Sequence, residues 1–415
     1  MADASGIRSK ARWLRITPIL FVTFSFAYLD RVNFSFAAAG GIAHDLALSP
    51  SMVSLVGALF FFGYFTAQVP GALLAERYSP KVVIFACLVA WGGFSALTGV
   101  VSNVWLLLIV RFLLGAVEAA VFPALLMFVN CWFARSERSL ANAFIILSTP
   151  VTVLWMSIVS GYLVKAFGWR LMFVAEGLPA SVWGVAWWFL VQDRPAQAHW
   201  LAPAERDAIE GQIAADQKDL KVAKDFRAAI ASPFVLRFAT LYFFWGVSLF
   251  GFILWLPTII KESGAKDIVT IGWLSSAPYL ATTLVMPVVS ILSDRAKDRR
   301  PIVGLLLALS AAAFLGLYAL RGGSFWQSYP LLCLAGIGPI AALAPFFAIP
   351  ADVLPKAVAG GASALINSLG ALGGFAGSYL VGWSNGLTHD PASSFLMMGV
   401  SLILAVVLLM RPLRL

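Results

Sequence analysis

Residues 26–36 read FAYLDRVNFSF, which sets an acid, a base and an amide side by side within an apolar run over 15–38. As a helix, a run of this length is enough to cross the ~30 Å hydrocarbon core of a bilayer, which takes about 20 residues. A charge at the centre of such a helix costs about 2.5–3.5 kcal/mol on insertion scales. The charges of Asp30 and Arg31 must therefore be neutralised by partners within the protein or serve its function.

The rest of the chain has the composition of a membrane protein. Of its 415 residues 60% are hydrophobic and only 12% charged, and it contains 32 Phe and 15 Trp. Long continuous apolar runs favour helices over the short alternating strands of a barrel. We expect an all-α polytopic membrane protein with twelve transmembrane helices at 15–38, 51–75, 82–101, 104–130, 140–165, 171–191, 234–259, 270–292, 301–320, 328–350, 357–383 and 392–411.

The basic residues predict the orientation of these helices. If both termini are cytoplasmic, most of the 29 Lys and Arg fall on the cytoplasmic side, as the positive-inside rule requires. The opposite side then carries Lys165, Arg170, Lys261, Lys266 and Arg321. The expected location is the inner (cytoplasmic) membrane of a cell.

Several other classes of function are not supported. The net charge of +9 follows from this topology, so no nucleic-acid partner is inferred from it. The three cysteines and three histidines lack the spacing of metal ligands, so we expect no metal and no cofactor. An embedded enzyme would need a catalytic cluster near an interface, and the sequence offers none. We expect a monomer.

The apolar pattern is interrupted once, and this interruption divides the chain. Residues 192–233 are dense in charge, and ERDAIEGQI within them fits an amphipathic helix at the membrane surface. We expect an N-terminal six-helix half over 1–191, a cytoplasmic linker over 192–233 and a C-terminal half over 234–415. A weak repeat joins the halves, because GALLAERYSPK (71–81) and ILSDRAKDRR (291–300) occupy equivalent positions.

This organisation resembles the major facilitator superfamily. Within it, YLDRVNFSFA, YFTAQVPGALLAERY, RFLLGAVEAAVFPA, FGWR and GGASALINSLGALGGFAG look like the anion:cation symporters, and the linker text DRPAQAHWLAPAER looks closest to the tartrate and rhamnonate branch. The resemblance implies pseudo-symmetric halves and symport of a small organic carboxylate with protons. Export of lipophilic, drug-like molecules is the alternative. Where APFFAIPAD (344–352) stands, Phe347 and Ala351 replace more polar groups of that branch, which favours a less hydroxylated substrate.

The substrate-binding candidates follow from helical spacing and from this resemblance. Tyr28 and Arg31 share a face, as do Asp30 and Asn33, and we expect both edges to face one lumen. The planar fork of Arg31 suits a carboxylate. Tyr64 and Gln68 are four apart on the second helix. Asn367 stands alone as an amide in a Gly-rich span, where it either binds substrate or bonds a neighbouring helix.

Proton coupling is expected to involve Asp30, Glu118 and Arg111. Arg111 and Glu118 lie two turns apart on one helix face, and small residues flank Glu118. The alternative is a fixed bridge between Arg111 and Asp30. Glu176 is interpreted as structural, with Arg170 or a backbone group as its partner.

The loop after the second helix carries Glu76 and Arg77. The resemblance implies that they form a conformational latch between the halves. A solvated turn would account for Arg77 but not for Glu76.

Overall fold

The computed structural model describes residues 10–218, 232–321, 323–354, 356–388 and 392–412, and every regular element in these ranges is a helix. Ten helical segments in these ranges are long and apolar enough to cross a membrane, and two of them, Val104–Trp132 and Phe325–Pro350, each join two consecutive helices. One of the ten, in α7 (Arg135–Leu190), carries two expected spans, and α1 (Lys10–Ala39) is not among the ten although it carries the expected first span. Each of the twelve expected spans falls on α1 or on one of these ten segments, so the fold class is confirmed.

The N-terminal part comprises seven helices: α1 (Lys10–Ala39), α2 (Ile42–Asp45), α3 (Pro50–Arg77), α4 (Pro80–Val100), α5 (Val104–Glu118), α6 (Val121–Trp132) and α7 (Arg135–Leu190). A short 3₁₀ turn, η1 (Pro195–Gln197), and α8 (Pro203–Lys218) follow. The C-terminal part comprises α10 (Pro233–Glu262), α11 (Ile268–Arg295), α12 (Arg300–Ala319), α13 (Phe325–Ala341), α14 (Leu343–Val353), α15 (Lys356–Thr388) and α16 (Ala392–Met410).

Polar caps define where several of these helices begin. The side chains of Ser49, Ser79, Asn103 and Asp267 each accept a hydrogen bond from the backbone N–H three residues later. Each cap satisfies one of the N–H groups that a helix start leaves without an intrahelical partner. The polar turns of this sequence therefore both separate the spans and initiate them.

Four expected spans differ in detail from a single straight helix. The fourth is broken at Ala119 and Ala120, between α5 and α6, and the tenth at Ala342, between α13 and α14. The fifth and sixth are expected to be separated by several residues. They instead form one helical run, α7, in which only Gly168 (φ 78°) is non-helical. The hydrogen bond between Ser160 and Glu176 joins the two limbs of α7 into an antiparallel hairpin.

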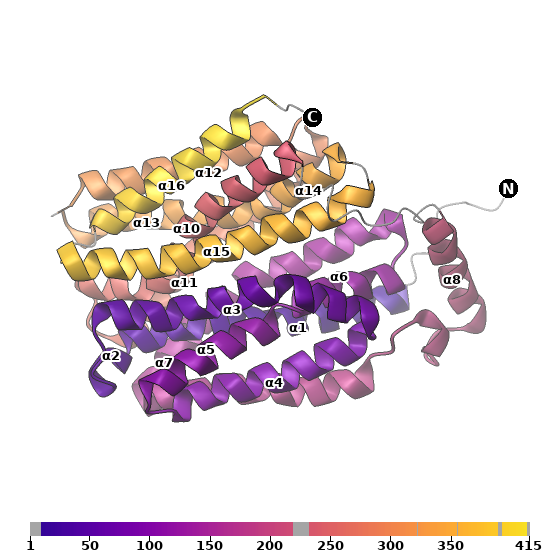
Figure 1. Ribbon diagram of the computed structural model, residues 1–415, viewed down its shortest axis with the longest axis horizontal. Coiled ribbons are helices and arrows are strands. Elements are labelled where there is room, and N and C mark those ends of the chain that lie inside the picture. Colours follow the sequence, from indigo (N-terminus) through magenta and orange to yellow (C-terminus); the bar gives the residue numbers. More distant parts are fainter. Residues whose placement is uncertain (1–9, 219–231, 322, 355, 389–391, 413–415) are drawn as a thin grey trace.

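Two groups of helices lie side by side along the long axis of the molecule (Figure 1). In this view α1–α7 lie below and α10–α16 above, and α8 lies at the right-hand end, here called the linker end. The groups meet where α3 packs on α15, α7 on α11 and α1 on α10. The division into halves with boundaries at 191 and 233 remains a prediction, and residues 219–231 lie outside the described ranges.

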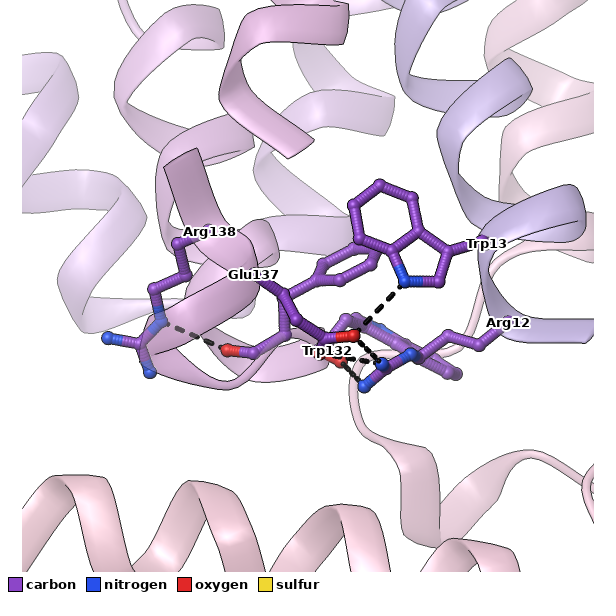
Figure 2. Close-up of polar contacts among 6 residues, drawn as sticks. Arg12, Trp13, Trp132, Glu137 and Arg138 are labelled. Carbon is purple, nitrogen blue, oxygen red and sulfur yellow. Dashed lines mark hydrogen bonds and ion pairs between the residues drawn. The ribbon is translucent and has the colours of Figure 1, made fainter. Parts of the chain in front are cut away.

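At the linker end, a buried ion pair ties α1 to α6 and α7 (Figure 2). The Arg12 guanidinium donates through Nη1 to the Trp132 carbonyl oxygen at 2.9 Å and through Nη2 to Glu137 at 2.6 and 2.7 Å. Trp13 Nε1 also donates to Glu137, at 3.1 Å. Trp200, between η1 and α8, stacks on Trp132 with ring centroids 5.8 Å apart. The first part of the linker is thus packed against the N-terminal helices.

The opposite end, here called the far end, holds polar contacts between the two groups. Lys165 Nζ, from α7, lies 2.9 Å from Oδ1 of Asp267, the cap of α11. Lys261 Nζ, from α10, donates to the Ala39 carbonyl oxygen of α1 at 2.6 Å. These contacts hold the two groups together at the far end.

Candidate functional site

A small cavity lies between the two groups of helices. Its walls come from α1, α3, α10 and α15, through Tyr28, Arg31, Phe61, Tyr64, Tyr242, Phe250, Asn367 and Ala371. Its volume is about 40 Å³, which is room for about three water molecules. The structure thus brings four of the residues expected to bind substrate, Tyr28, Arg31, Tyr64 and Asn367, to one place.

Arg31 is the charged residue of this lining. Its Nε and Nη2 both donate to Oε1 of Glu118, at 2.9 and 2.6 Å. The guanidinium lies over the rings of Tyr28 and Tyr64, at 4.7 and 4.8 Å from their centroids. Arg31 is 9% exposed and Glu118 1%, so this is a desolvated pair whose partners depend on each other.

Asp30 does not face the cavity with Arg31, contrary to the expectation of one shared lumen. Its carboxylate accepts hydrogen bonds from Asn33 Nδ2 at 2.9 Å and from the Ser95 hydroxyl of α4. Because successive residues on a helix diverge by about 100°, the Asp30 and Asn33 edge points into the N-terminal helices. The other carboxylate oxygen of Asp30 is buried without a hydrogen-bond partner among the described residues.

Arg111 is buried, but it forms no ion pair with Asp30. Its guanidinium lies over the rings of Phe34 and Phe60, at 4.8 and 5.3 Å. Within the described part of the chain, its Nε and Nη1 atoms have no hydrogen-bond partner. The fixed bridge between Arg111 and Asp30, considered as an alternative, is therefore wrong for this structure, because Arg31 and Glu118 form the ion pair instead.

Gln68 and Glu176 do not make the contacts that were expected for them. Gln68 is 2% exposed and does not line the cavity, although it lies one turn beyond Tyr64. Glu176 accepts a hydrogen bond from Ser160 at 2.7 Å. Arg170, its expected partner, donates instead to the backbone oxygens of Gly99 and Val101, because the hairpin at Gly168 turns it toward the end of α4.

A second cavity, of about 570 Å³, lies at the linker end around the turn between α3 and α4. Glu76 and Arg77 line it together with Asp193 and Arg194. The Ser79 hydroxyl donates to Asp193, which ties this turn to the start of the linker. All residues of this lining precede α8, so the two expected latch residues lie beside the start of the linker.

Sequence reasoning missed the aromatic and apolar part of the central lining, namely Phe61, Tyr242, Phe250 and Ala371. In a chain with 32 Phe, single aromatic residues give no signal that separates a cavity wall from lipid-facing or core positions. Ser95, the partner of Asp30, gave no signal either. No group of three or more His, Cys, Asp or Glu side chains in the described ranges is placed to hold a metal ion.

Comparison with known proteins gives consistent matches. The profile of the Major Facilitator Superfamily matches residues 20–378 and 266–414. A putative tartrate transporter of Agrobacterium vitis is 31% identical over 92% of this chain and 85% of its own length. A quinolone resistance transporter of Acinetobacter baumannii is 28% identical over 95% of this chain and 92% of its own length.

Among solved structures, a bacterial homologue of the human lysosomal transporter Spinster, in an inward-facing and unoccupied conformation, superposes with a TM-score of 0.71. It is 17% identical and covers 97% of this chain and 95% of its own. At this level of sequence identity, the structural similarity shows a shared fold and nothing about the substrate.

Proposed function

The chain belongs to the Major Facilitator Superfamily and is a multi-pass membrane transporter rather than an enzyme, and we propose that it imports a small organic carboxylate together with protons. The single observation that carries this proposal is the ion pair between Arg31 and Glu118 at the central cavity. A guanidinium at a dehydrated cavity is suited to bind a carboxylate. Here an internal carboxylate already occupies it.

This pair supplies a route to coupling. The substrate carboxylate and Glu118 compete for the same donors on Arg31. A proton on Glu118 removes the competing charge and leaves Arg31 able to bind the anion. The empty carrier then favours the internal pair, and the loaded carrier holds both proton and substrate. One proton thus travels with each substrate that displaces Glu118.

Asp30 and Arg111 are assigned supporting roles. Asp30 has one carboxylate oxygen without a partner, and Arg111 has unpaired nitrogens, among the described residues. Buried ionisable groups of this kind in a transporter are functional candidates by default. We assign Asp30 as a second protonation site and Arg111 as the cation that stabilises its charged form. Asn367, which lines the cavity, completes the proposed polar set at the substrate. Gln68, which lies outside the lining, is not assigned a contact with the substrate in this conformation.

Alternating access follows from the position of the cavity between two groups of helices. We assign the linker end to the cytoplasm of an inner membrane, since the basic residues gather there. We assign Glu76 and Arg77, at the linker end of α3, as the conformational latch of this cycle. The transporter is proposed to work as a monomer.

Export of a drug-like molecule is the second candidate. The similarity to a quinolone resistance transporter and the aromatic part of the cavity favour it. Arg31 argues against lipophilic cations, because like charges repel in a dehydrated cavity.

The sign of proton movement separates the two. Purified protein is reconstituted into liposomes that contain a pH dye, and carboxylates are added outside without a pH gradient. Symport acidifies the lumen, whereas exchange of substrate against protons makes it alkaline. Protein-free liposomes subtract passive entry of neutral acids. The import assignment would be wrong if no carboxylate acidified the lumen more than in protein-free liposomes. An alkaline response to a lipophilic cation would then support export instead.

A further inference from the structure

The walls of the central cavity differ from one another in chemistry. On the N-terminal side, Arg31 is framed by the rings of Tyr28 and Tyr64. On the C-terminal side, Tyr242 and Phe250 come from α10, and Asn367 and Ala371 from α15. The C-terminal wall carries no charge. A ligand held here has one charged end at Arg31 and lies with the rest of its surface against rings.

The aromatic wall is fixed in place by packing. The Tyr242 ring stacks on Phe346 with centroids 5.2 Å apart and meets the edges of Trp245 and Phe347 at 5.5 and 5.2 Å. Phe250 lies 4.5 Å from Phe61. Rings at these separations are within the range of favourable aromatic contacts. The wall is therefore a set surface rather than a group of mobile side chains.

Two glycines of α15 make this arrangement possible. A Cβ at Gly370 would lie 2.1 Å from two carbons of the Tyr242 ring, and a Cβ at Gly374 would lie 2.7 Å from the Phe250 ring. Both rings thus lie directly against the α15 backbone. A larger residue at either position would displace a ring of the wall.

We propose that the substrate is a planar aromatic or heteroaromatic monocarboxylate, an assignment that rests on the proposed function. Its carboxylate binds Arg31, its ring lies on Phe61, Tyr242 and Phe250, and Asn367 binds a ring heteroatom or a single hydroxyl. A flat ring also needs the least widening of a narrow cavity.

Hydroxylated and doubly charged acids fit less well. Each hydroxyl that leaves water without a hydrogen-bond partner costs binding energy, and the C-terminal wall offers only the Tyr242 hydroxyl and the Asn367 amide. A second carboxylate would face rings without a counter-charge. Arg111 does not line the cavity and is covered by Phe34 and Phe60. The replacement of a polar group by Phe347, whose ring packs on Tyr242, agrees with this preference. The side chain of Ala351 lies outside those described.

The test is a panel of carboxylates titrated calorimetrically into the full-length protein in lipid nanodiscs. Benzoate and nicotinate are the planar probes, and cyclohexanecarboxylate matches benzoate in size and charge without a flat ring. Tartrate and gluconate represent the hydroxylated acids, and benzamide is the uncharged control. We expect benzoate or nicotinate to bind about tenfold or more tightly than the other acids, which corresponds to a difference on the scale of ring contacts.

Variants of Tyr242 test whether the aromatic wall causes the preference for planar acids. Tyr242→Leu should remove the advantage of benzoate over cyclohexanecarboxylate, whereas Tyr242→Phe, which keeps the ring, and Tyr318→Leu, outside the cavity, should retain it. If tartrate or gluconate binds as tightly as benzoate, or Tyr242→Leu weakens all acids by one factor, the aromatic assignment is wrong while carboxylate transport stands. If no carboxylate binds, the proposed function fails as well.

Discussion

At the scale of single residues, Arg31 is the group on which binding and coupling both depend. Its ring contact with Tyr28 could be predicted from their spacing of three along a helix. Helix geometry also predicts that Asp30 and Arg31 point about 100° apart. The expectation that both face one lumen did not take this rotation into account. The pairing of Arg31 with Glu118 could not be predicted, because the two lie on α1 and α5 and their distance is set by how those helices dock.

Arg31→Lys tests this residue with its charge kept. Lys supplies a compact point charge instead of a planar fork, so it loses the two-pronged geometry toward a carboxylate. We expect the affinity for the preferred carboxylate to fall about tenfold or more, since a charge-assisted hydrogen bond contributes about 1.5–3 kcal/mol. Calorimetric titration of the carboxylate into the variant measures this affinity.

Arg321→Lys, at a far-end turn, is the control and should bind as the wild type does. Wild-type affinity in Arg31→Lys would mean that Arg31 only stabilises the helix.

At the scale of elements, prolines explain the breaks that the hydropathy pattern did not reveal. Pro123 lacks the N–H that would bond the carbonyl of Ala119, and Pro345 likewise cannot bond that of Ala341. The two breaks, between α5 and α6 and between α13 and α14, thus have the same cause in the fourth and tenth spans. The first break places Glu118 at the last turn of α5, beside α1. Pro70, Pro257 and Pro287 lie inside helices that continue past them, so proline positions alone would not have predicted which spans break.

The packing of α3 on α5 depends on a glycine next to the site. A Cβ at Gly115 would lie 1.9 Å from the Phe60 carbonyl oxygen of α3. Gly115→Ala should therefore separate the helix of Glu118 from that of Tyr64, at a cost of about 1–3 kcal/mol. We expect a lower melting temperature in detergent and weaker carboxylate binding.

Gly93→Ala provides the matched control, because a Cβ at Gly93 meets nothing within 4 Å. Alanine stabilises a helix interior by about 0.5–1 kcal/mol relative to glycine. Equal melting temperatures for Gly115→Ala and Gly93→Ala would contradict this account of the contact.

At the scale of the whole molecule, hydropathy and charge predicted the helix count and the resemblance supplied the architecture. The conformational state could not be predicted, because one sequence encodes every state of an alternating-access cycle. The described structure joins the two groups at the far end through Lys165 with Asp267 and Lys261 with Ala39. We interpret these contacts as the closed outer gate.

Asp267→Asn should loosen that gate without unfolding the protein. Asn caps a helix about as well as Asp, so the start of α11 is kept while the ion pair with Lys165 is lost. The hydrogen bond from Lys165 lowers the pKa of Asp267. The contact is therefore intact at neutral pH and weakens only as the pH falls through that lowered pKa.

Spin labels at His44→Cys and Lys266→Cys, with the native cysteines replaced, measure the gate. We expect Asp267→Asn to add a longer distance. Asp298→Asn, which breaks an exposed pair with Arg300 within the C-terminal helices, should leave the distances unchanged. Identical distributions in all three proteins would mean that the pair does not bias the gate.

The most direct test of coupling compares exchange with accumulation in Glu118→Gln. Glutamine mimics the protonated acid permanently, so the cavity binds substrate without taking up a proton. In proteoliposomes, we predict that this variant exchanges labelled for unlabelled carboxylate at a rate within about tenfold of the wild type, yet fails to concentrate it when only a pH difference is applied. Accumulation equal to that of the wild type would contradict the assignment of Glu118 as the proton-coupling residue.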